Sequence, residues 1–287
     1  MGIGWSWKKR ISKVGFALIV LVLIVIIDFP VYWMIKTSIE SPLDFMSKEI
    51  SLLPQSISFE NYKNIWHSLK YASHIKFRDN MVNSFVVVGI STLVSLVIAI
   101  PAAYSLTRFK YRHKESIAQG ILYVYMFPQM ILLIPLLILV SRLGLYNTLT
   151  SLIIVYCTFS LPYSIWMLRG YFLGLPPSLE EAAMIDGCTR LEAFRRITLP
   201  LASPGLVATA IYCFILGWDN VIYPLTFITY EHKKVLSIGF LSLISGDVTP
   251  WGGVMAASVI TAIPVMILFW MLQRAIVQGM TAGAIKQ

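Results

Sequence analysis

The 287 residues are 57% hydrophobic and only 13% charged, with a mean hydropathy of +0.74, whereas soluble domains are about one-quarter charged. This composition predicts an all-α integral membrane protein and leaves no room for a separate soluble domain, so residues 1–287 are expected to form a single transmembrane domain. The net charge of +9 comes from short basic runs at the ends of apolar blocks, which indicates membrane orientation and no nucleic-acid partner.

Six apolar blocks are long enough to cross a bilayer, which takes about 20 helical residues. The predicted spans are 14–35, 81–104, 117–140, 150–168, 204–229 and 254–276. Lys8, Lys9, Arg10 and Lys13 precede the first block, as basic residues precede a signal peptide, but no small-residue cleavage site follows. We therefore expect this block to remain as the first span.

The distribution of basic residues predicts the orientation. The loop between the second and third spans carries four basic residues against one acid, Glu115. These residues are Arg108, Lys110, Arg112 and Lys114. The positive-inside rule places this loop and the N-terminal segment in the cytoplasm. Six spans then put both termini there, together with the loop 169–203 between the fourth and fifth spans.

Polar and aromatic residues inside the spans are candidates for lining a passage through the membrane. Trp218, Asp219 and Asn220 fall near the middle of the fifth span, where an ionisable group is costly and usually faces protein or water. Further candidates are Tyr223, Gln129 and Tyr163. The alternative is that such residues hold helices together or belong to the aromatic belts at the membrane surface.

The loop 169–203 carries two patterns that predict helix starts. Ser178 stands three residues before Glu181, and Thr189 stands three before Glu192, so each pair predicts a capping box. Gly187 can take the left-handed conformation that ends a helix. We expect two short helices, at 179–186 and 190–198. The first would present a small, flat contact stripe formed by Leu179, Ala182 and Ala183, and the second would be anchored by Leu191, Phe194 and Ile197.

Sequence motifs for catalysis and for metal binding are not found. No GxxxxGKS phosphate loop occurs, so the chain is not expected to hydrolyse ATP or to carry a cofactor itself. The four histidines have no metal-ligand spacing, the three cysteines form no CxxC pair, and HExxH and GxSxG do not appear. We predict neither catalytic residues nor a metal site.

The segment EAAMIDG at 181–187, followed by Phe194, Ile197, an LP pair at 199–200 and a PG pair at 204–205, resembles the EAA signature of ABC-importer permeases. In that family this cytoplasmic loop forms coupling helices that dock on a cytosolic ATPase. The resemblance therefore implies an ATPase-coupling role for Glu181, Ala182, Ala183, Asp186, Gly187, Leu199 and Pro200. Cys188 stands where alanine is commoner.

Four further segments, SFENYKNIW, FRDNMVNSF, GWDNVIYPLTF and QGMTAGAIK, resemble the permeases of maltose-type carbohydrate importers. The resemblance implies a bacterial inner-membrane subunit that imports sugars, above all oligosaccharides. Its partners would be a second, non-identical permease, two cytosolic ATPases that carry ATP and Mg, an extracytoplasmic sugar-binding protein, and membrane lipid.

Two further features follow from the maltose-type resemblance. The C-terminal tail would regulate the ATPases through Gln278, Gly279 and Thr281. The fifth-span motif of that family more often reads tryptophan, asparagine and glutamate, so Asp219 and Asn220 depart from it.

Two other classes of function remain open on the residues alone. One is a membrane receptor or scaffold whose loop recruits a cytosolic protein without transport. The other is a proton-coupled carrier that uses Asp28 and Asp219, for which a well-capped cytoplasmic loop has no evident use.

Overall fold

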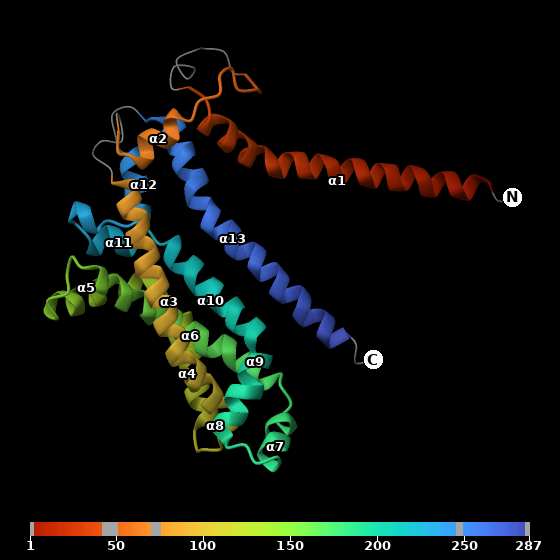
Figure 1. The fold of residues 1–287 in the computed structure, drawn as a ribbon, viewed down its shortest axis with the longest axis vertical. Helices are drawn as coiled ribbons and strands as arrows, with labels where there is room; N and C mark the ends of the chain where they lie inside the picture. Colours follow the sequence, from red (N-terminus) through yellow and green to blue (C-terminus); the bar gives the residue numbers. More distant parts are fainter. Residues whose placement is uncertain (1–2, 42–50, 70–75, 245–248, 285–287) are drawn as a thin grey trace. The chain divides into compact units, whose positions relative to one another are not determined.

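The computed structural model describes residues 3–41, 51–69, 76–244 and 249–284. These residues form helices joined by short connections, with no strand among them (Figure 1). The chain divides into two compact units, Met1–Ile75 with Ser242–Ala262, and Lys76–Leu241 with Ile263–Gln287. The all-α prediction is confirmed, and a single transmembrane domain stays a prediction.

The first unit contains α1 (Ile3–Ser38), α2 (Glu60–Trp66) and the beginning of α13 (Trp251–Ala284). The side-chain amide of Asn61 in α2 donates hydrogen bonds to the carbonyl oxygens of Ser38, at 3.2 Å, and of Glu40, at 2.8 Å. Glu40 also forms an ion pair with Lys36 at 2.7 Å. These contacts hold α2 against the end of α1.

The second unit contains the remaining helices, of which α3, α6 and α10 form the core. Its elements are α3 (Phe77–Arg108), α4 (Lys114–Met126), η3 (Gln129–Leu132), α5 (Leu133–Arg142), α6 (Leu149–Leu173), α7 (Ser178–Ile185), α8 (Arg190–Ala193), η4 (Phe194–Thr198), α9 (Leu199–Leu201), α10 (Ser203–Trp218), α11 (Ile222–Phe227), η5 (Glu231–Lys233) and most of α12 (Leu236–Ile244).

Small side chains let the three core helices approach closely, as is usual in membrane proteins. The hydroxyl groups of Ser95 in α3 and Ser160 in α6 lie 2.6 Å apart, and the Ser164 hydroxyl lies 3.1 Å from the Cys213 sulfur in α10. Gly205 in α10 packs directly on the ring of Tyr171, so close that a β-carbon there would lie 2.3 Å from the ring.

The helices are consistent with the predicted number of spans, and the boundaries of the spans stay predictions. Four continuous helices are long and apolar enough to cross a membrane: Gly15–Ser38, Phe77–Arg108, Leu149–Leu173 and Trp251–Met271. Two bent pairs bring the number to six: Lys114–Met126 with Gln129–Arg142, bent by 85°, and Arg190–Leu201 with Ser203–Trp218, bent by 69°. Six spans are obtained when each bent pair counts as one, although the second pair begins at Arg190, inside the loop 169–203, and not at the predicted residue 204.

The third and fifth predicted spans are not continuous helices. Within 117–140, Phe127 takes an extended conformation before Pro128, because a following proline disfavours the helical one. Within 204–229, α10 ends at Trp218, and α11 begins only at Ile222. Proline alone does not predict such breaks, since Pro101 and Pro162 lie inside continuous helices.

Candidate functional site

Within the predicted loop 169–203, residues 169–173 continue α6, and two short helical segments follow at one end of the second unit, Ser178–Ile185 and Arg190–Leu201. Glu192 and Thr189 form the expected capping box: the Glu192 amide donates to the Thr189 hydroxyl at 3.3 Å, and the Thr189 amide donates to the Glu192 carboxylate at 2.8 Å. Gly187, between the helices, has a φ of +92°, as predicted. Beyond Ala193 the second helix continues as a π-helical turn, Phe194–Thr198.

The capping box predicted at Ser178 is wrong. Ser178 is the first helical residue of α7, and no side chain caps this end. The reason is that Pro177 already has helical dihedral angles, φ −59° and ψ −27°, so the helix begins one residue earlier than the pattern indicated. Ser178 then occupies a position from which its hydroxyl cannot cap the helix.

The predicted contact stripe of Leu179, Ala182 and Ala183 is also wrong, because these residues do not share an exposed face. Ala183 is buried, and Ala182 and Leu179 are exposed. The inner face of α7 is formed by Ala183 and Glu180, three residues apart. The outer face carries Glu181, Ala182, Ile185 and Asp186.

The anchor of the second helix also differs from the expectation. Leu191 is 56% exposed, whereas Ala193 and Thr198 are buried, and the ring of Phe194 lies 4.4 Å from that of Tyr104. Leu199 is half-buried and Pro200 is exposed, at the start of α9. Of the anchor residues expected from the sequence, Phe194 therefore has the clearest packing contact.

A buried carboxylate, Glu180, holds the inner face of α7 against the rest of the unit. It accepts hydrogen bonds from the Arg108 Nε at 2.7 Å, the Tyr104 hydroxyl at 2.8 Å and the Thr198 hydroxyl at 2.7 Å. Arg108 Nη2 also donates to the Leu175 carbonyl at 2.9 Å. Because its partners lie on α3 and in the π-helical turn, Glu180 joins three segments at one point.

These contacts outweigh the cost of burying the charge. Burial alone would raise the pKa of Glu180, but the hydrogen bonds from Thr198, Arg108 and Tyr104, with the positive charge of Arg108, hold it below its ordinary value of 4.5. The carboxylate is therefore ionised at neutral pH and pairs with Arg108, whose side chain is 9% exposed.

Sequence spacing does not reveal this cluster, because Arg108 lies 72 residues from Glu180 and belongs to a basic run that indicates membrane orientation.

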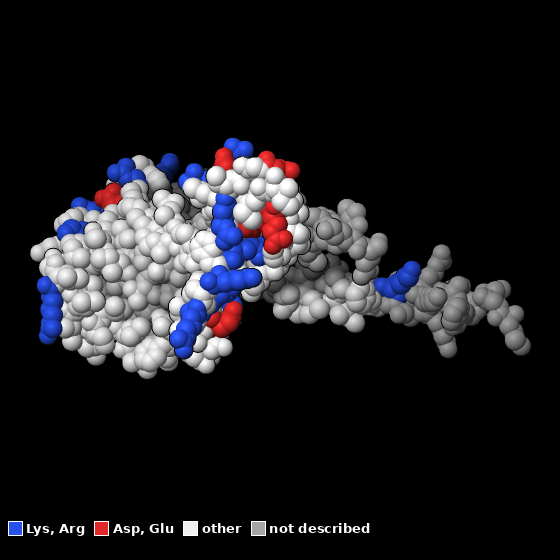
Figure 2. Space-filling view, turned by 90° about the horizontal axis from the view of Figure 1, so that it is seen from below, with Lys and Arg blue, Asp and Glu red and all other residues white. Residues whose placement is uncertain are grey.

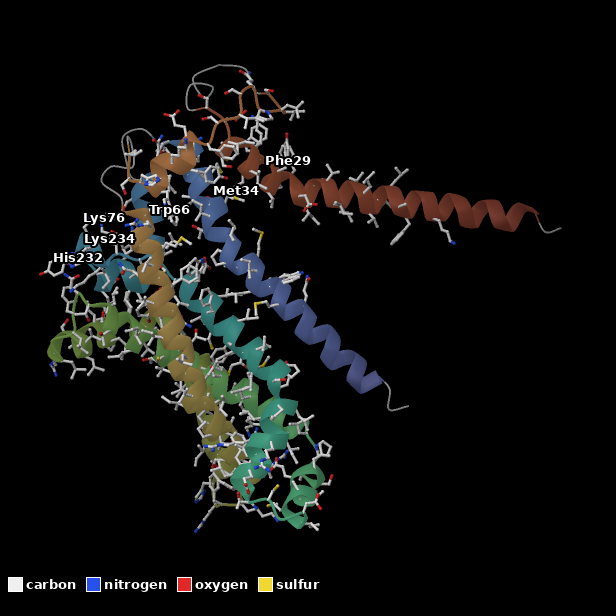
Figure 3. The ribbon with its side chains drawn as sticks, viewed as in Figure 1. Phe29, Met34, Trp66, Lys76, His232 and Lys234 are labelled. Carbon is white, nitrogen blue, oxygen red and sulfur yellow. The ribbon has the colours of Figure 1, made fainter. Side chains whose placement is uncertain are left out.

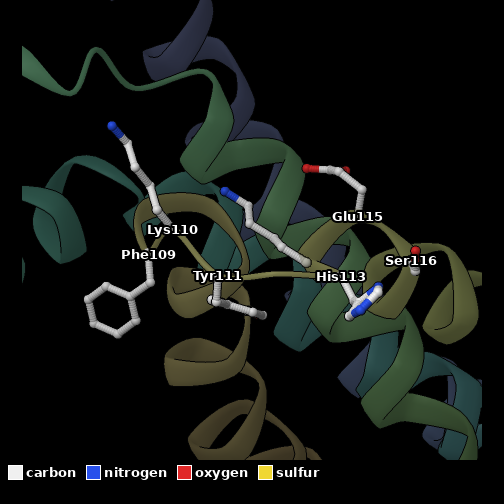
Figure 4. A pocket seen from close by; sticks show the side chains of 7 residues that line it. Phe109, Lys110, Tyr111, His113, Glu115 and Ser116 are labelled. Atoms are coloured by element: carbon white, nitrogen blue, oxygen red, sulfur yellow. The ribbon is translucent and has the colours of Figure 1, made fainter.

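The surface at this end of the unit is strongly charged. Figure 2 looks onto the end that carries α7 and α8 and shows basic and acidic side chains side by side. A shallow hollow of about 500 Å³ lies at the turn between α3 and α4. Phe109 and Lys110 extend from this turn in different directions (Figure 4). The basic residues of this turn thus lie at the same end of the unit as α7.

Four of the six passage candidates line one pocket, which lies where the fifth span breaks. Gln129, Asp219, Asn220 and Tyr223 surround a space of about 270 Å³ together with Met130, Val221 and Ile222. The Tyr223 hydroxyl donates to the Gln129 carbonyl at 2.6 Å, and the Asn220 side-chain oxygen accepts from the Tyr223 amide at 3.2 Å. The non-helical residues between α10 and α11 therefore carry polar groups into this pocket.

The other two passage candidates lie elsewhere in the second unit. Trp218 is 7% exposed and packs between Phe85 and Phe214, with ring centroids 4.8 and 5.3 Å away. Tyr163 stacks on Tyr212 at 3.8 Å. Neither lines the pocket formed by Gln129 and Asn220.

The predicted regulatory residues Gln278, Gly279 and Thr281 lie in the last turns of α13, which extends to Ala284. Their side chains fall outside the described residues, so their role stays a prediction.

Residues 95–282 match the family model described as "Binding-protein-dependent transport system inner membrane component". The chain is 35% identical to the inner membrane ABC transporter permease protein YcjP of Escherichia coli (strain K12), over 97% of this chain and 98% of that protein. It is also 35% identical to the trehalose/maltose transport system permease protein MalG of Thermococcus litoralis, over 90% and 91% of the two chains.

Among solved structures, the chain resembles a subunit of a bacterial ABC transporter involved in the import of the acidic polysaccharide alginate. The TM-score is 0.76 at 23% identity, covering 93% of this chain and 97% of that one. This similarity shows the fold, and the family match spans the helices that carry both the loop and the pocket. The chain therefore belongs to the family of inner membrane components of binding-protein-dependent transport systems, and is a multi-pass membrane permease.

Proposed function

We propose that this permease is one of two non-identical membrane subunits of an ATP-driven sugar importer, and that oligosaccharides are its substrates. Relatives named for trehalose/maltose and diacetylchitobiose uptake, at 35% identity over at least 90% of this chain, support the sugar class. The other partners would be two cytosolic ATPases, which bind ATP and Mg, and an extracytoplasmic sugar-binding protein.

The observation that carries the proposal is the two-sided character of α7. Its outer face, with Glu181, Ala182 and Asp186, is exposed, while its inner face is fixed through the buried Glu180. A short helix whose inner face is fixed to the protein and whose outer face is exposed to solvent is suited to dock on a moving partner. Gly187 ends this helix, and the exposed Pro200 lies farther along the same loop.

The proposed orientation places α7 and both termini in the cytoplasm. It is supported by the basic turn between α3 and α4, which lies at the same end of the second unit as α7 and α8 (Figure 1), where Arg190 of α8 lies 5.3 Å from the ring of Phe109. The tail residues Gln278, Gly279 and Thr281 would then lie on the ATPase side. Closure of the ATPases would push on α7 and shift the helices between inward- and outward-facing states.

Replacing Ala182 with tryptophan tests the docking face. The bulky ring would prevent close approach of the ATPase, so sugar uptake and binding-protein-stimulated ATP hydrolysis in proteoliposomes should fall by about tenfold or more. Ser116→Trp is the matched control, since Ser116 is exposed on α4 outside α7. Uptake at the wild-type rate in Ala182→Trp would contradict this role.

The pocket at Gln129, Asn220 and Tyr223 is proposed to belong to the sugar passage, because its polar groups are offered by non-helical backbone inside an apolar region. Asn220→Ala removes an amide from the pocket wall. We expect lower uptake or an altered preference among sugars, with assembly of the complex unchanged on co-purification. Wild-type uptake across a panel of oligosaccharides would remove Asn220 from the passage.

A further inference from the structure

The turn between α3 and α4 carries positive charge that has no acidic partner among the described residues. Lys110 and Arg112 are exposed, and neither forms an ion pair within the part of the chain that the structure describes. Glu115, which follows the turn, pairs instead with Arg169 at 2.5 Å, and the buried Glu180 is held by its own hydrogen-bond partners. The turn therefore keeps a net positive charge.

This turn lies at the surface of the membrane. It joins Phe77–Arg108, which is long and apolar enough to cross the membrane, to Lys114–Met126, the first half of a bent span. Tyr111 in the turn is exposed, and the ring of Trp166, near the end of α6, lies 5.7 Å from the guanidinium group of Arg169. Tyrosine and tryptophan favour the level of the lipid headgroups. The unpaired charges of the turn therefore lie at the depth of the lipid phosphates.

The shape of the turn can receive a small charged group. The hollow of about 500 Å³ at this turn has Lys110, His113 and Lys114 in its lining (Figure 4). The Lys114 ammonium group donates to the Thr107 carbonyl at 3.0 Å, which ties the start of α4 to the end of α3. The basic groups are thus held around one hollow on a turn that is fixed from behind.

The opposite end of the second unit also carries basic side chains, but two of them are paired. Lys76 and Lys234 lie at the end where α3 begins (Figure 3). Lys234 forms an ion pair with Glu231 at 2.5 Å, and Arg78 lies 3.7 Å from Asp79. Acidic neighbours therefore reduce the charge at that end, whereas Lys110 and Arg112 have none.

We propose that the turn between α3 and α4 is a binding site for the headgroup of an anionic phospholipid. Arg112 offers a planar group that can bind two phosphate oxygens at once, and Lys110 adds a second positive charge. Basic residues beside a membrane helix attract anionic lipid in this way. The exposed side chain of Ile117, one turn into α4, is placed to contact the acyl chain. The inference requires a membrane permease and does not depend on its substrate.

The test measures which lipid the full-length chain retains, together with the subunits that co-purify with it. The protein is equilibrated in detergent micelles with equal amounts of phosphatidylglycerol, which is anionic, and phosphatidylcholine, which is zwitterionic. Native mass spectrometry then gives the ratio of the two lipids that stay bound. We expect the wild type to prefer phosphatidylglycerol, and Lys110→Gln combined with Arg112→Gln to lower this preference by about tenfold.

Two matched variants separate the site from the total charge of the protein. Lys76→Gln combined with Arg142→Gln also removes two exposed basic residues, but outside the turn, and should keep the wild-type preference. Lys110→Arg combined with Arg112→Lys keeps both charges in the turn and should keep the preference within about twofold. An equal loss in the Lys76 and Arg142 variant would show that only net charge matters and would overturn the site.

The same preference in the wild type and in the doubly neutralised variant would also overturn it. If that double variant cannot be purified, Lys110→Gln and Arg112→Gln are measured singly. Each should lower the preference by about threefold, and no loss in either would contradict the proposal. Inorganic phosphate added in excess should not displace the bound phosphatidylglycerol. Displacement would show that the turn binds free phosphate and would overturn the assignment to a lipid.

Discussion

Glu180 and Glu181 are adjacent and chemically identical, yet one is buried in an ion pair and the other faces solvent. The resemblance to the EAA signature implies a coupling role for Glu181 and none for Glu180. The environment of Glu180 depends on Arg108, which is brought near only when α3 and the loop pack together. Local spacing predicted the capping box at Thr189, because its partner is three residues away, but it could not predict contacts between distant residues.

The stabilisation from Glu180 is expected to disappear in acid. Its pKa in the folded protein lies below 4.5, so its contribution is fully present above that value and is lost as the pH falls through the folded pKa. The difference in melting temperature between wild type and Glu180→Gln, measured in detergent, should be constant from about pH 7 to about pH 5 and shrink below about pH 4. A difference that grows toward acid pH would contradict the assignment.

At the scale of elements, hydrophobic length predicted where the long apolar helices lie, but not where they break. The apolar runs around Pro128 and Asp219 look continuous in the sequence, and both are interrupted in the structure. Pro162 lies in a continuous helix and Pro128 does not, so the surrounding packing decides the outcome. The pocket at Asn220 follows from such a break, which is why the sequence identified several of its residues without showing which of them meet.

The two expected caps of the loop offer a direct comparison. Thr189→Ala removes an observed capping box and should lower the free energy of unfolding by about 1 kcal/mol. Ser178→Ala should leave it nearly unchanged, because the Ser178 side chain caps nothing. Thermal denaturation of both variants measures the difference, and equal losses would show that Ser178 does contribute to the start of α7.

At the scale of the whole molecule, the chain is a multi-pass membrane permease, and its dependence on partner subunits is a proposal. Family and fold follow from the helices and from the match over residues 95–282. The energy source is a proposal, which rests on the exposed outer face of α7 and on the absence of a phosphate loop from the sequence. A proton-coupled carrier or a receptor would share the membrane helices but would not need ATP hydrolysis for sugar accumulation.

The most direct test is uptake of radiolabelled oligosaccharide into proteoliposomes that contain this permease with its partner permease and ATPases. The binding protein is supplied on the outer side, and ATP is enclosed on the ATPase side. We predict accumulation that requires both hydrolysable ATP and the binding protein, and that continues when a pH gradient is collapsed. Accumulation driven by a pH gradient without ATP, or ATPase recruitment without any uptake, would contradict the account.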